Sequence, residues 1–425
     1  DKVDDEDDPD SDILGPTAAG RAYRARKNRI AHETSKKFSE FYSILAPQRE
    51  KSRSNRRSSH EFLTDQEIEA ANKTDHETAT VKHTLGLKQD KLIKSSGGSM
   101  GLLKFHPFED SLVVCNDKCS VTMWDTKTGV QTANLINSKS KGTRITSSCW
   151  INESSNSLLA TGCDDGTVRV WDGLVVNPAE KREPDLCAAF CALPELRRGS
   201  SGSGLILEWQ QNSGRLLAGG NTSCFRSWDL ATESCISSHA TDTDACITTL
   251  TTSWTEGMSA PSRGSAIGPD TVVAGFSNGR LRMFDLRTKI AAHEISEQRY
   301  RSKLMHYKEH NSWIVTTALT YYGTGNELIS GCTSGNIKVW DLRAGSSLLT
   351  FRVQSSPMTA LAVHPTVPMV ATGSKAQFIK LFTLDGETLQ LIRYHEEMKG
   401  HRIGPVGCLA FHPHKLQLAA GGTDS

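Results

Sequence analysis

One short pattern recurs along the chain and limits its possible folds more than any other feature of the sequence. The pattern is a small apolar run, a turn of small or acidic residues, an alternating run, and an aromatic residue followed by Asp. Complete copies end at Trp124 and Asp125, Trp171 and Asp172, Trp228 and Asp229, Phe284 and Asp285, and Trp340 and Asp341. A degenerate copy covers 369–383, and a further copy begins at 416. The sequence therefore predicts a protein built from repeated units.

Each copy is typical of two β-strands joined by a tight turn. Residues 167–171 alternate in polarity, and Asp165-Gly166 and Asn278-Gly279 tolerate the positive φ angles of hairpin turns. Other strand-like runs precede most copies and follow several, which gives four strands per unit. Four strands ending in Trp-Asp indicate a blade of a β-propeller. We expect an all-β fold, a seven-bladed WD-repeat β-propeller over residues 96–425, in which the aromatic and Asp residues have structural roles.

The last of these blades is truncated, because residues 416–425 reach only its second strand. The run TATVKHTLGL at 78–87 is a candidate outer strand for it. A third strand is still missing, which leaves unpaired backbone groups at an edge. We expect the sequence to be a fragment of a longer polypeptide, and to be less stable than a form extended by about one strand pair.

The blades also diverge from well-formed WD repeats, which often link a His at the blade entrance to a Ser or Thr, an Asp and the Trp. Only His310 stands at a plausible entrance, and Ser334 replaces the turn Asp of that blade. We therefore expect no blade to hold the full polar network.

We expect residues 1–95 to form a polar extension that does not belong to the propeller. A basic amphipathic helix is expected over about 17–45, with Thr17 as its N-cap and an apolar stripe that includes Phe38 and Phe41. The helix has three possible roles: docking on this protein or a partner, contact with acidic lipid or nucleic acid, or folding only on binding. The Ser/Arg-rich segment after it predicts disorder. Its spacing of basic residues makes Ser52, Ser58 and Ser59 candidate phosphorylation sites, with a solvated linker as the alternative.

No catalytic, cofactor or metal site is indicated. Cys115 and Cys119, and Cys187 and Cys191, form Cys-x3-Cys pairs, but no second pair follows at the spacing of a zinc site. The glycine-rich run at 199–204 lacks the Lys-Ser/Thr of a phosphate-binding loop. A propeller enzyme usually places charged or metal-binding residues at the channel mouth, and no such repetition is visible. The sequence therefore favours a binding module over an enzyme.

Charge and cysteine content indicate which partners and which cellular compartment are compatible with the sequence. The net charge is +1, which gives no overall bias toward nucleic acid. The 11 cysteines are scattered and odd in number, and no signal peptide or membrane-length apolar run is present. We expect reduced thiols in a cytoplasmic protein whose contact with membranes is at most indirect.

Non-repeating residues carry a resemblance to a known family. The segment RYHEEMKGHRIGPVGCLAFHPHKLQLAAGG (393–422) is similar to the propeller of the Raptor family, the scaffold subunits of the TOR kinase complex. LLKFHPFEDSLVV (102–114), MHYKEHNSWIV (305–315) and GLILEWQQNSGRLLAGG (204–220) resemble it as well, and RARKNRI (24–30) resembles a helix ahead of its propeller. The Ser-rich loop 251–270 departs from the family by insertion.

The resemblance implies a non-catalytic scaffold that binds the TOR kinase, its complex subunits and regulators. It also implies roles in assembly, substrate recruitment and nutrient-responsive control of cell growth, with recruitment to the lysosomal surface. The alternative is a substrate- or partner-binding propeller of a ubiquitin ligase or chromatin complex. Trp313, beside His310, is the candidate contact residue because Trp is enriched at binding hot spots, and a core position is the alternative.

Overall fold

A computed structural model gives the arrangement of the repeats. The residues that it describes are 87–94, 98–117, 119–138, 142–152, 157–174, 184–197, 202–210, 213–252, 270–287, 293–295, 310–320, 327–342, 346–365, 367–396 and 401–423. All regular structure in these residues is β-strand. The expected helix at 17–45, the phosphorylation sites and most of the 78–87 strand lie outside the described residues.

Four-stranded antiparallel sheets, here called blades, follow one another in sequence order. Blade 1 contains β1 (Met100–Phe105), β2 (Ser111–Asn116), β3 (Ser120–Asp125) and β4 (Gln131–Ile136). Blade 2 contains β5 (Ile145–Ile151), β6 (Leu158–Cys163), β7 (Thr167–Asp172) and β8 (Asp185–Cys191). Blade 3 contains β9 (Leu205–Gln210), β10 (Arg215–Gly220), β11 (Cys224–Asp229) and β12 (Ser234–Ala240). In each, the chain zigzags from the inner strand to the outer one.

The remaining sheets continue this order. Blade 4 contains β13 (Ile247–Thr252), β14 (Thr271–Phe276), β15 (Leu281–Asp285) and β16 (His293–Ile295). Blade 5 contains β17 (Ile314–Thr320), β18 (Glu327–Cys332), β19 (Asn336–Asp341) and β20 (Ser346–Arg352). Blade 6 contains β21 (Met358–Val363), β22 (Met369–Ser374), β23 (Phe378–Thr383) and β24 (Thr388–Ile392). A last sheet has two strands among the described residues, β25 (Val406–Phe411) and β26 (Leu418–Gly422).

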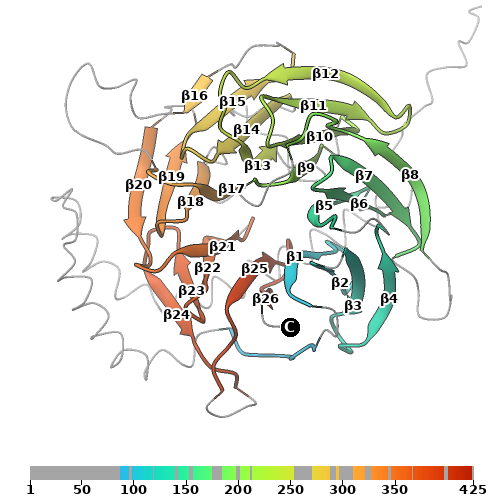
Figure 1. Cartoon of the computed structure of the whole chain (residues 1–425). Coiled ribbons are helices and arrows are strands. Elements are labelled where there is room, and N and C mark those ends of the chain that lie inside the picture. The colour runs from blue at the N-terminus through green and yellow to red at the C-terminus, as the bar shows by residue number, and fades with distance from the viewer. Residues whose placement is uncertain are drawn as a thin grey trace, which may run out of the picture.

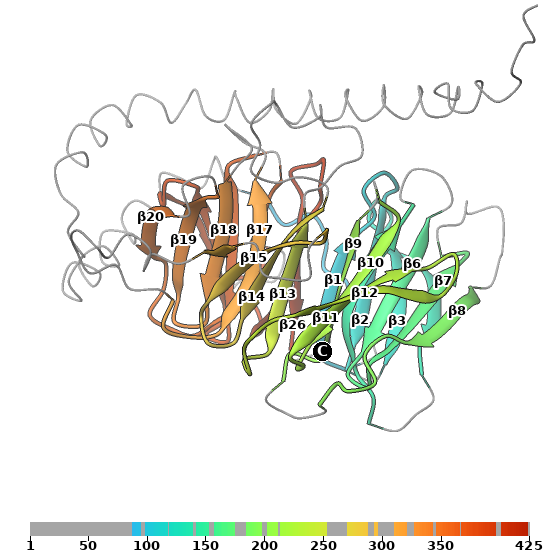
Figure 2. The same cartoon turned by 90° about the horizontal axis from the view of Figure 1, so that it is seen from above.

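The sheets stand around a common axis (Figures 1 and 2). The first strand of each sheet is innermost, and β25 lies between β21 and β1, so contacts run around the whole ring. Side chains fasten neighbouring inner strands: the Thr146 hydroxyl donates to the Leu205 carbonyl at 2.8 Å and accepts from its N–H at 2.9 Å. The prediction of an all-β WD-repeat propeller is confirmed.

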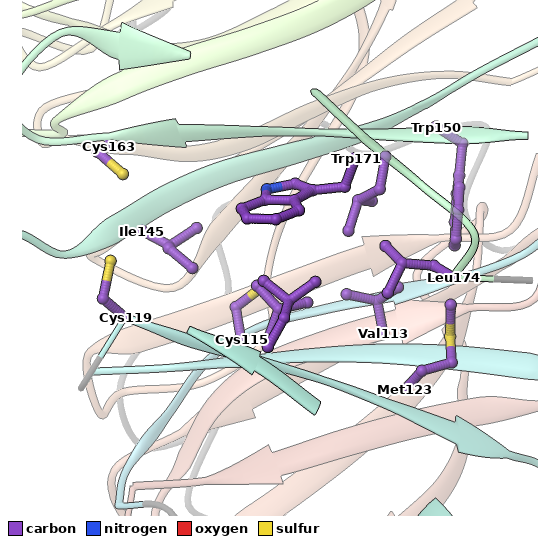
Figure 3. Packing of buried hydrophobic residues seen from close by; sticks show 12 residues of the cluster. Val113, Cys115, Cys119, Met123, Ile145, Trp150, Cys163, Trp171 and Leu174 are labelled. Carbon is purple, nitrogen blue, oxygen red and sulfur yellow. The ribbon is translucent and has the colours of Figure 1, made fainter. Parts of the chain in front are cut away.

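The hydrophobic core lies between the blades, because each sheet buries both faces against its neighbours. The cluster between blades 1 and 2 includes Val113, Met123, Trp150 and Leu159, all at most 2% exposed (Figure 3). Burying a large apolar side chain contributes about 1.5–3 kcal/mol. Most of the stabilisation thus comes from contacts between units, as expected of a repeat protein.

The turns between the second and third strands bring neighbouring blades close together. Gly166, Gly279 and Gly335 occupy the same place in this turn and have φ angles of 82°, 84° and 83°. A Cβ on any of them would lie 2.0–2.2 Å from a carbonyl oxygen of the segment that leads into the next blade. Glycine is therefore required for two reasons: the positive φ angle, and the close approach of a carbonyl oxygen to the Cα atom.

Candidate functional site

The Trp-Asp positions that reveal the repeat are used inside the fold. The Asp125, Asp229 and Asp285 carboxylates accept backbone N–H groups two residues later, at 2.8, 2.9 and 3.0 Å. Hydrogen bonds from the Thr128 hydroxyl and from the Lys127 and Thr128 N–H groups lower the pKa of Asp125. Burial has the opposite effect but does not cancel them. Asp172 accepts from the Gly173 N–H, while Asp341 ends its strand and is half-buried.

The aromatic partners of these Asp residues pack in the core. Trp340 and Phe284 are almost fully buried, Trp124 and Trp171 are buried, and Trp228 is half-buried against Phe190. Their packing in the core fits the structural role expected for these residues.

Blade 5 contains a polar relay that begins at His310. The His310 Nε2 atom is 2.7 Å from the Ser330 hydroxyl oxygen, which also accepts the Trp340 indole N–H at 2.8 Å. Burial and the Lys338 charge lower the pKa of His310 to about 3, so the imidazole is neutral at physiological pH. Its Nδ1 atom has no partner among the described residues. The relay has three members and lacks the Asp, which Ser334 replaces.

Blade 2 contains a second relay that sequence reasoning missed. The Asn137 Oδ1 atom accepts from the Thr161 hydroxyl at 2.7 Å and from the Trp171 indole N–H at 2.8 Å. Asn137 therefore takes the place that His310 has in blade 5. The missed signal was an amide residue at the blade entrance together with a Thr in the second strand.

Blade 3 lacks such a relay in its described residues. Ala218 faces Arg226 in the register in which Ser330 faces Lys338. With no hydroxyl there, the Trp228 indole N–H is buried without a partner among the described residues. The polar networks therefore differ from blade to blade.

Trp313 lies at the entrance of blade 5, close in sequence to His310. It is half-buried, and its carbonyl accepts the Thr333 N–H at 2.9 Å. Trp313 is thus partly exposed at the entrance of blade 5. Ser52, Ser58 and Ser59, the candidate phosphorylation sites, lie outside the described residues.

Charged and aromatic residues join the last sheet to blade 1. The Lys415 ammonium lies 2.5 Å from Asp110, which also binds Lys127 at 2.6 Å. Burial acts to raise the pKa of Asp110, but the hydrogen bonds from Lys127 and Lys415 outweigh it and lower that pKa. The rings of Phe105 and His412 contact each other at 5.3 Å between centroids. These contacts close the ring.

An apolar cavity of about 1370 Å³ opens beside this junction, between blade 6 and blade 1. Residues 87–93 border it on the outside and β26 on the inside. Its walls are mainly apolar and include Leu103, Phe105, Trp124, Phe378, Ile379 and Ile392. Among the described residues β26 pairs only with β25, so its outer backbone edge faces this cavity.

The cysteine pairs do not assemble a metal site. Cys115 and Cys119 are buried, whereas Cys187 and Cys191 are exposed on the outer strand β8. Over the described ranges, no group of three or more His, Cys, Asp or Glu residues is arranged to hold a metal ion. No helix within the described part of the chain is long and apolar enough to span a membrane.

Family models match parts of the propeller. The model described as "Nucleolar protein 10-like, N-terminal domain" matches residues 265–415. The model described as "WD domain, G-beta repeat" matches residues 135–172. Each covers less than half of the chain.

Longer matches come from curated proteins. "Target of rapamycin complex 1 subunit mip1" of Schizosaccharomyces pombe is 33% identical over 76% of this chain and 23% of that protein. "Protein raptor homolog" of Dictyostelium discoideum is 32% identical over 78% of this chain and 20% of that protein. The chain thus spans about a fifth to a quarter of the length of these relatives.

A solved structure agrees with these matches. The crystal structure of Chaetomium thermophilum Raptor superposes with a TM-score of 0.62 and 27% sequence identity. The superposition covers 77% of this chain and 27% of that one.

Proposed function

Because the propeller of this chain is a Raptor-type C-terminal WD-repeat region, we propose that it is a non-catalytic protein-interaction scaffold of a TOR complex. The observation that supports this proposal is that the matches to TOR complex 1 subunits extend over three quarters of the chain. The protein binds the TOR kinase, other complex subunits and regulators, and it supports assembly and substrate recruitment. No bound cofactor and no nucleic acid are part of this function.

Affinity purification from native lysate tests the proposal. The full protein is the bait, a variant that lacks residues 96–425 is the comparison, and mass spectrometry identifies the recovered proteins. We expect the TOR kinase with the full protein and less of it with the variant. Failure of the full protein to recover the kinase would overturn the proposal, and subunits of a ubiquitin ligase or chromatin complex in its place would support the alternative assembly. Equal recovery by both baits would remove the propeller from the interaction.

We further propose that the protein acts in nutrient-responsive growth signalling, in the cytoplasm and at the lysosomal surface. This proposal rests on the family relationship. Fluorescence microscopy of the tagged protein before and after amino-acid resupply tests it, with colocalisation with a lysosomal marker as the expected result. An unchanged diffuse signal while the TOR kinase relocates would contradict it.

We also propose that the ring has seven blades and that the last is completed in the cavity beside β26. Six sheets already have four strands each, and β26 presents its outer edge to an apolar cavity. Leu87 exchanges two hydrogen bonds with the Gln390 side chain, and Lys91 donates to the Thr126 carbonyl. Residues 87–91 thus cross from blade 6 to blade 1 at the outer side of the cavity, where a fourth strand belongs.

Trp313 is the contact residue that we propose for a partner, because it is partly exposed at the entrance of blade 5 and Trp is enriched at binding hot spots. The variant W313A is expected to lose partner recovery in the affinity purification and to keep its folded β-sheet circular dichroism spectrum. For the N-terminal segment, phosphopeptide mapping from cells tests modification of Ser52, Ser58 and Ser59. Absence of phosphate at all three would leave the segment as a polar linker.

A further inference from the structure

The turn between β2 and β3 of blade 1 carries a cysteine at a position where blades 2, 4 and 5 have glycine and blade 6 has Gln377, which has a similar φ of 62°. Cys119 has a φ angle of 60° and precedes Val121 by two residues, as Gly166 precedes Val168 and Gly335 precedes Ile337. Residues with a Cβ rarely adopt this left-handed conformation. Strained positions are often retained for function, so the side chain itself requires an explanation.

The Cys119 side chain points across the blade interface toward a second thiol. Cys163 ends β6 of blade 2, and both sulfur atoms point into the same space beside Ile145 (Figure 3). The two thiols are close enough to shift each other's pKa. The Asn137 Nδ2 atom is 3.2 Å from the Cys163 sulfur and 4.0 Å from the Cys119 sulfur. One amide group thus contacts both sulfur atoms.

The surroundings fix the orientation of these groups. The Asn137 Oδ1 atom is held by Thr161 and Trp171, which directs its NH2 group toward the thiols. The Asn137 backbone N–H also donates to the Cys119 carbonyl at 2.9 Å, which fixes the strained turn. Thiols held in one geometry by several contacts are prepared for reaction with each other.

The two thiols differ in the direction in which their surroundings shift the pKa. The interaction with the Cys163 thiol has the largest effect on the pKa of Cys119. Together with Asn137 and the positive charge of Arg169, it lowers this pKa to about 7, against the opposing effect of burial. The same interaction, together with burial, raises the pKa of Cys163. Nearby Cys115 has a pKa raised to about 12 by burial. These effects favour ionisation of Cys119 over that of Cys163.

We propose that Cys119 and Cys163 form a peroxide-sensitive dithiol site whose oxidation joins blade 1 to blade 2 by a disulfide. The Cys119 thiolate attacks one oxygen of hydrogen peroxide, forms a sulfenic acid and releases hydroxide, which takes up a proton. Cys163 then attacks the Cys119 sulfur, the S–O bond breaks, and the Cys163 proton leaves with the hydroxyl as water. Two thiols and one peroxide give one disulfide and two waters, and an excess of a small thiol reverses the reaction.

The size of the oxidant follows from burial. Cys119 is 2% exposed and Cys163 is fully buried. A molecule as small as hydrogen peroxide reaches them through small fluctuations of the turn, whereas a bulky disulfide such as oxidised glutathione does not. The site is thus distinct from the exposed thiols of Cys187, Cys191 and Cys235.

Peptide mapping of the full protein tests the proposal. The reduced protein is treated with hydrogen peroxide, blocked with N-ethylmaleimide in denaturant, and digested without reductant by trypsin and chymotrypsin. Cleavage after Trp150 separates Cys149 from Cys163. We expect a linked peptide pair that contains Cys119 and Cys163, disappears on reduction, and is absent from C119G and C163S. The C119G variant keeps the turn conformation, because glycine adopts this φ without strain.

Matched variants and a second readout make the test specific. Cys332 occupies the position of Cys163 in blade 5, where the facing turn has Gly279, so C332S is expected to form the link normally. The rate of Cys119 alkylation by iodoacetamide is expected to rise with a midpoint near pH 7, and the midpoint is expected to rise in C163S. Recovery of both thiols unlinked from folded, peroxide-treated protein whose exposed cysteines are oxidised would overturn the proposal. Overoxidation of Cys119 to sulfinic acid without the link would overturn it as well.

Discussion

At the residue scale, one hydroxyl decides whether a buried Trp donor is satisfied. Ser330 receives the Trp340 N–H and contacts His310, whereas Ala218 leaves the corresponding N–H of Trp228 unpaired within the described structure. A buried polar group that loses its partner costs about 1–3 kcal/mol. The repeats therefore contribute unequally to stability although they share one fold.

Replacing Ser330 with Ala is expected to lower the free energy of unfolding by about 1–3 kcal/mol, because it orphans groups on His310 and Trp340. Urea denaturation followed by circular dichroism measures the change. The exposed Ser355 offers a control, and S355A is expected to stay within about 0.5 kcal/mol of the parent protein. Equal effects of the two substitutions would show that the relay contributes no stability.

Sequence patterns identified residues that repeat and missed residues whose roles come from tertiary contacts. Asn137 lies 24 residues before Thr161, whereas His310 lies 20 before Ser330, so no fixed spacing marks the relay. The outer strand Asp185–Cys191 buries few of its residues, so burial gives its sequence little recognisable pattern. The inner strands were readily predicted because both of their faces are buried. The pairing of Cys119 with Cys163 depends on the packing of two blades and leaves no local signal.

At the element scale, the turn glycines set how closely blades approach each other. A Cβ on Gly335 would lie 2.2 Å from the Gln354 carbonyl oxygen, which belongs to the segment leading into blade 6. Both the turn and the Gln354 carbonyl are backbone, so relieving this contact requires a shift of the main chain. Blade spacing is thus determined by turn geometry in addition to side-chain packing.

The variant G335A is expected to be much less stable than G142A. Gly142 has a nearly identical φ of 84° but open space around its Cβ position, so its substitution adds only backbone strain of about 1–2 kcal/mol. The clash at Gly335 adds to that strain, and we expect a total of about 3 kcal/mol or more. Thermal and urea unfolding of both variants measures the difference. Similar values would mean that the blades separate easily.

At the scale of the whole molecule, the ring is closed by contacts around Asp110. The ion pair of Asp110 with Lys415 joins residues 305 positions apart in the sequence, and both side chains are partly exposed. Such pairs contribute less than about 1 kcal/mol and weaken in salt. Closure therefore depends on the neighbouring aromatic contacts as well as on charge.

The substitution K415M is expected to lower stability by up to about 1 kcal/mol in dilute buffer, with a smaller difference at high salt. Differential scanning calorimetry at low and high sodium chloride measures both. The variant R287M removes an ion pair with Asp285 inside one turn and serves as the control, with little expected effect. A loss that does not change with salt would assign the role of Lys415 to packing.

Buried imidazoles make the whole ring sensitive to acid. Burial lowers the pKa of His310 and His412 to about 3 and that of His364 to about 4, below the value of 6.5 for a free imidazole. Below pH 6.5 the unfolded chain takes up protons that the folded ring excludes. The stabilising effect is therefore complete above pH 6.5 and is lost as the pH falls toward 4.

Each of these histidines is expected to cost roughly 1.4 kcal/mol of stability per pH unit below 6.5. Urea unfolding at pH 7.5, 6.5 and 5.5 measures the slope. In H412N the slope is expected to decrease by the equivalent of about one bound proton. A flat profile in the parent protein would contradict neutral burial of the imidazoles.

The connection between β13 and β14 has a practical consequence for protein engineering. The two strands pair in register at Thr252 and Val272, although residues 253–270 separate them in the sequence. Because doubling the length of a connection costs only about 0.6 kcal/mol of closure entropy, this hairpin is a favourable place to insert further sequence. An epitope or split-reporter fragment placed there would label one rim of the ring, which would allow bound partners to be mapped by proximity without altering any blade.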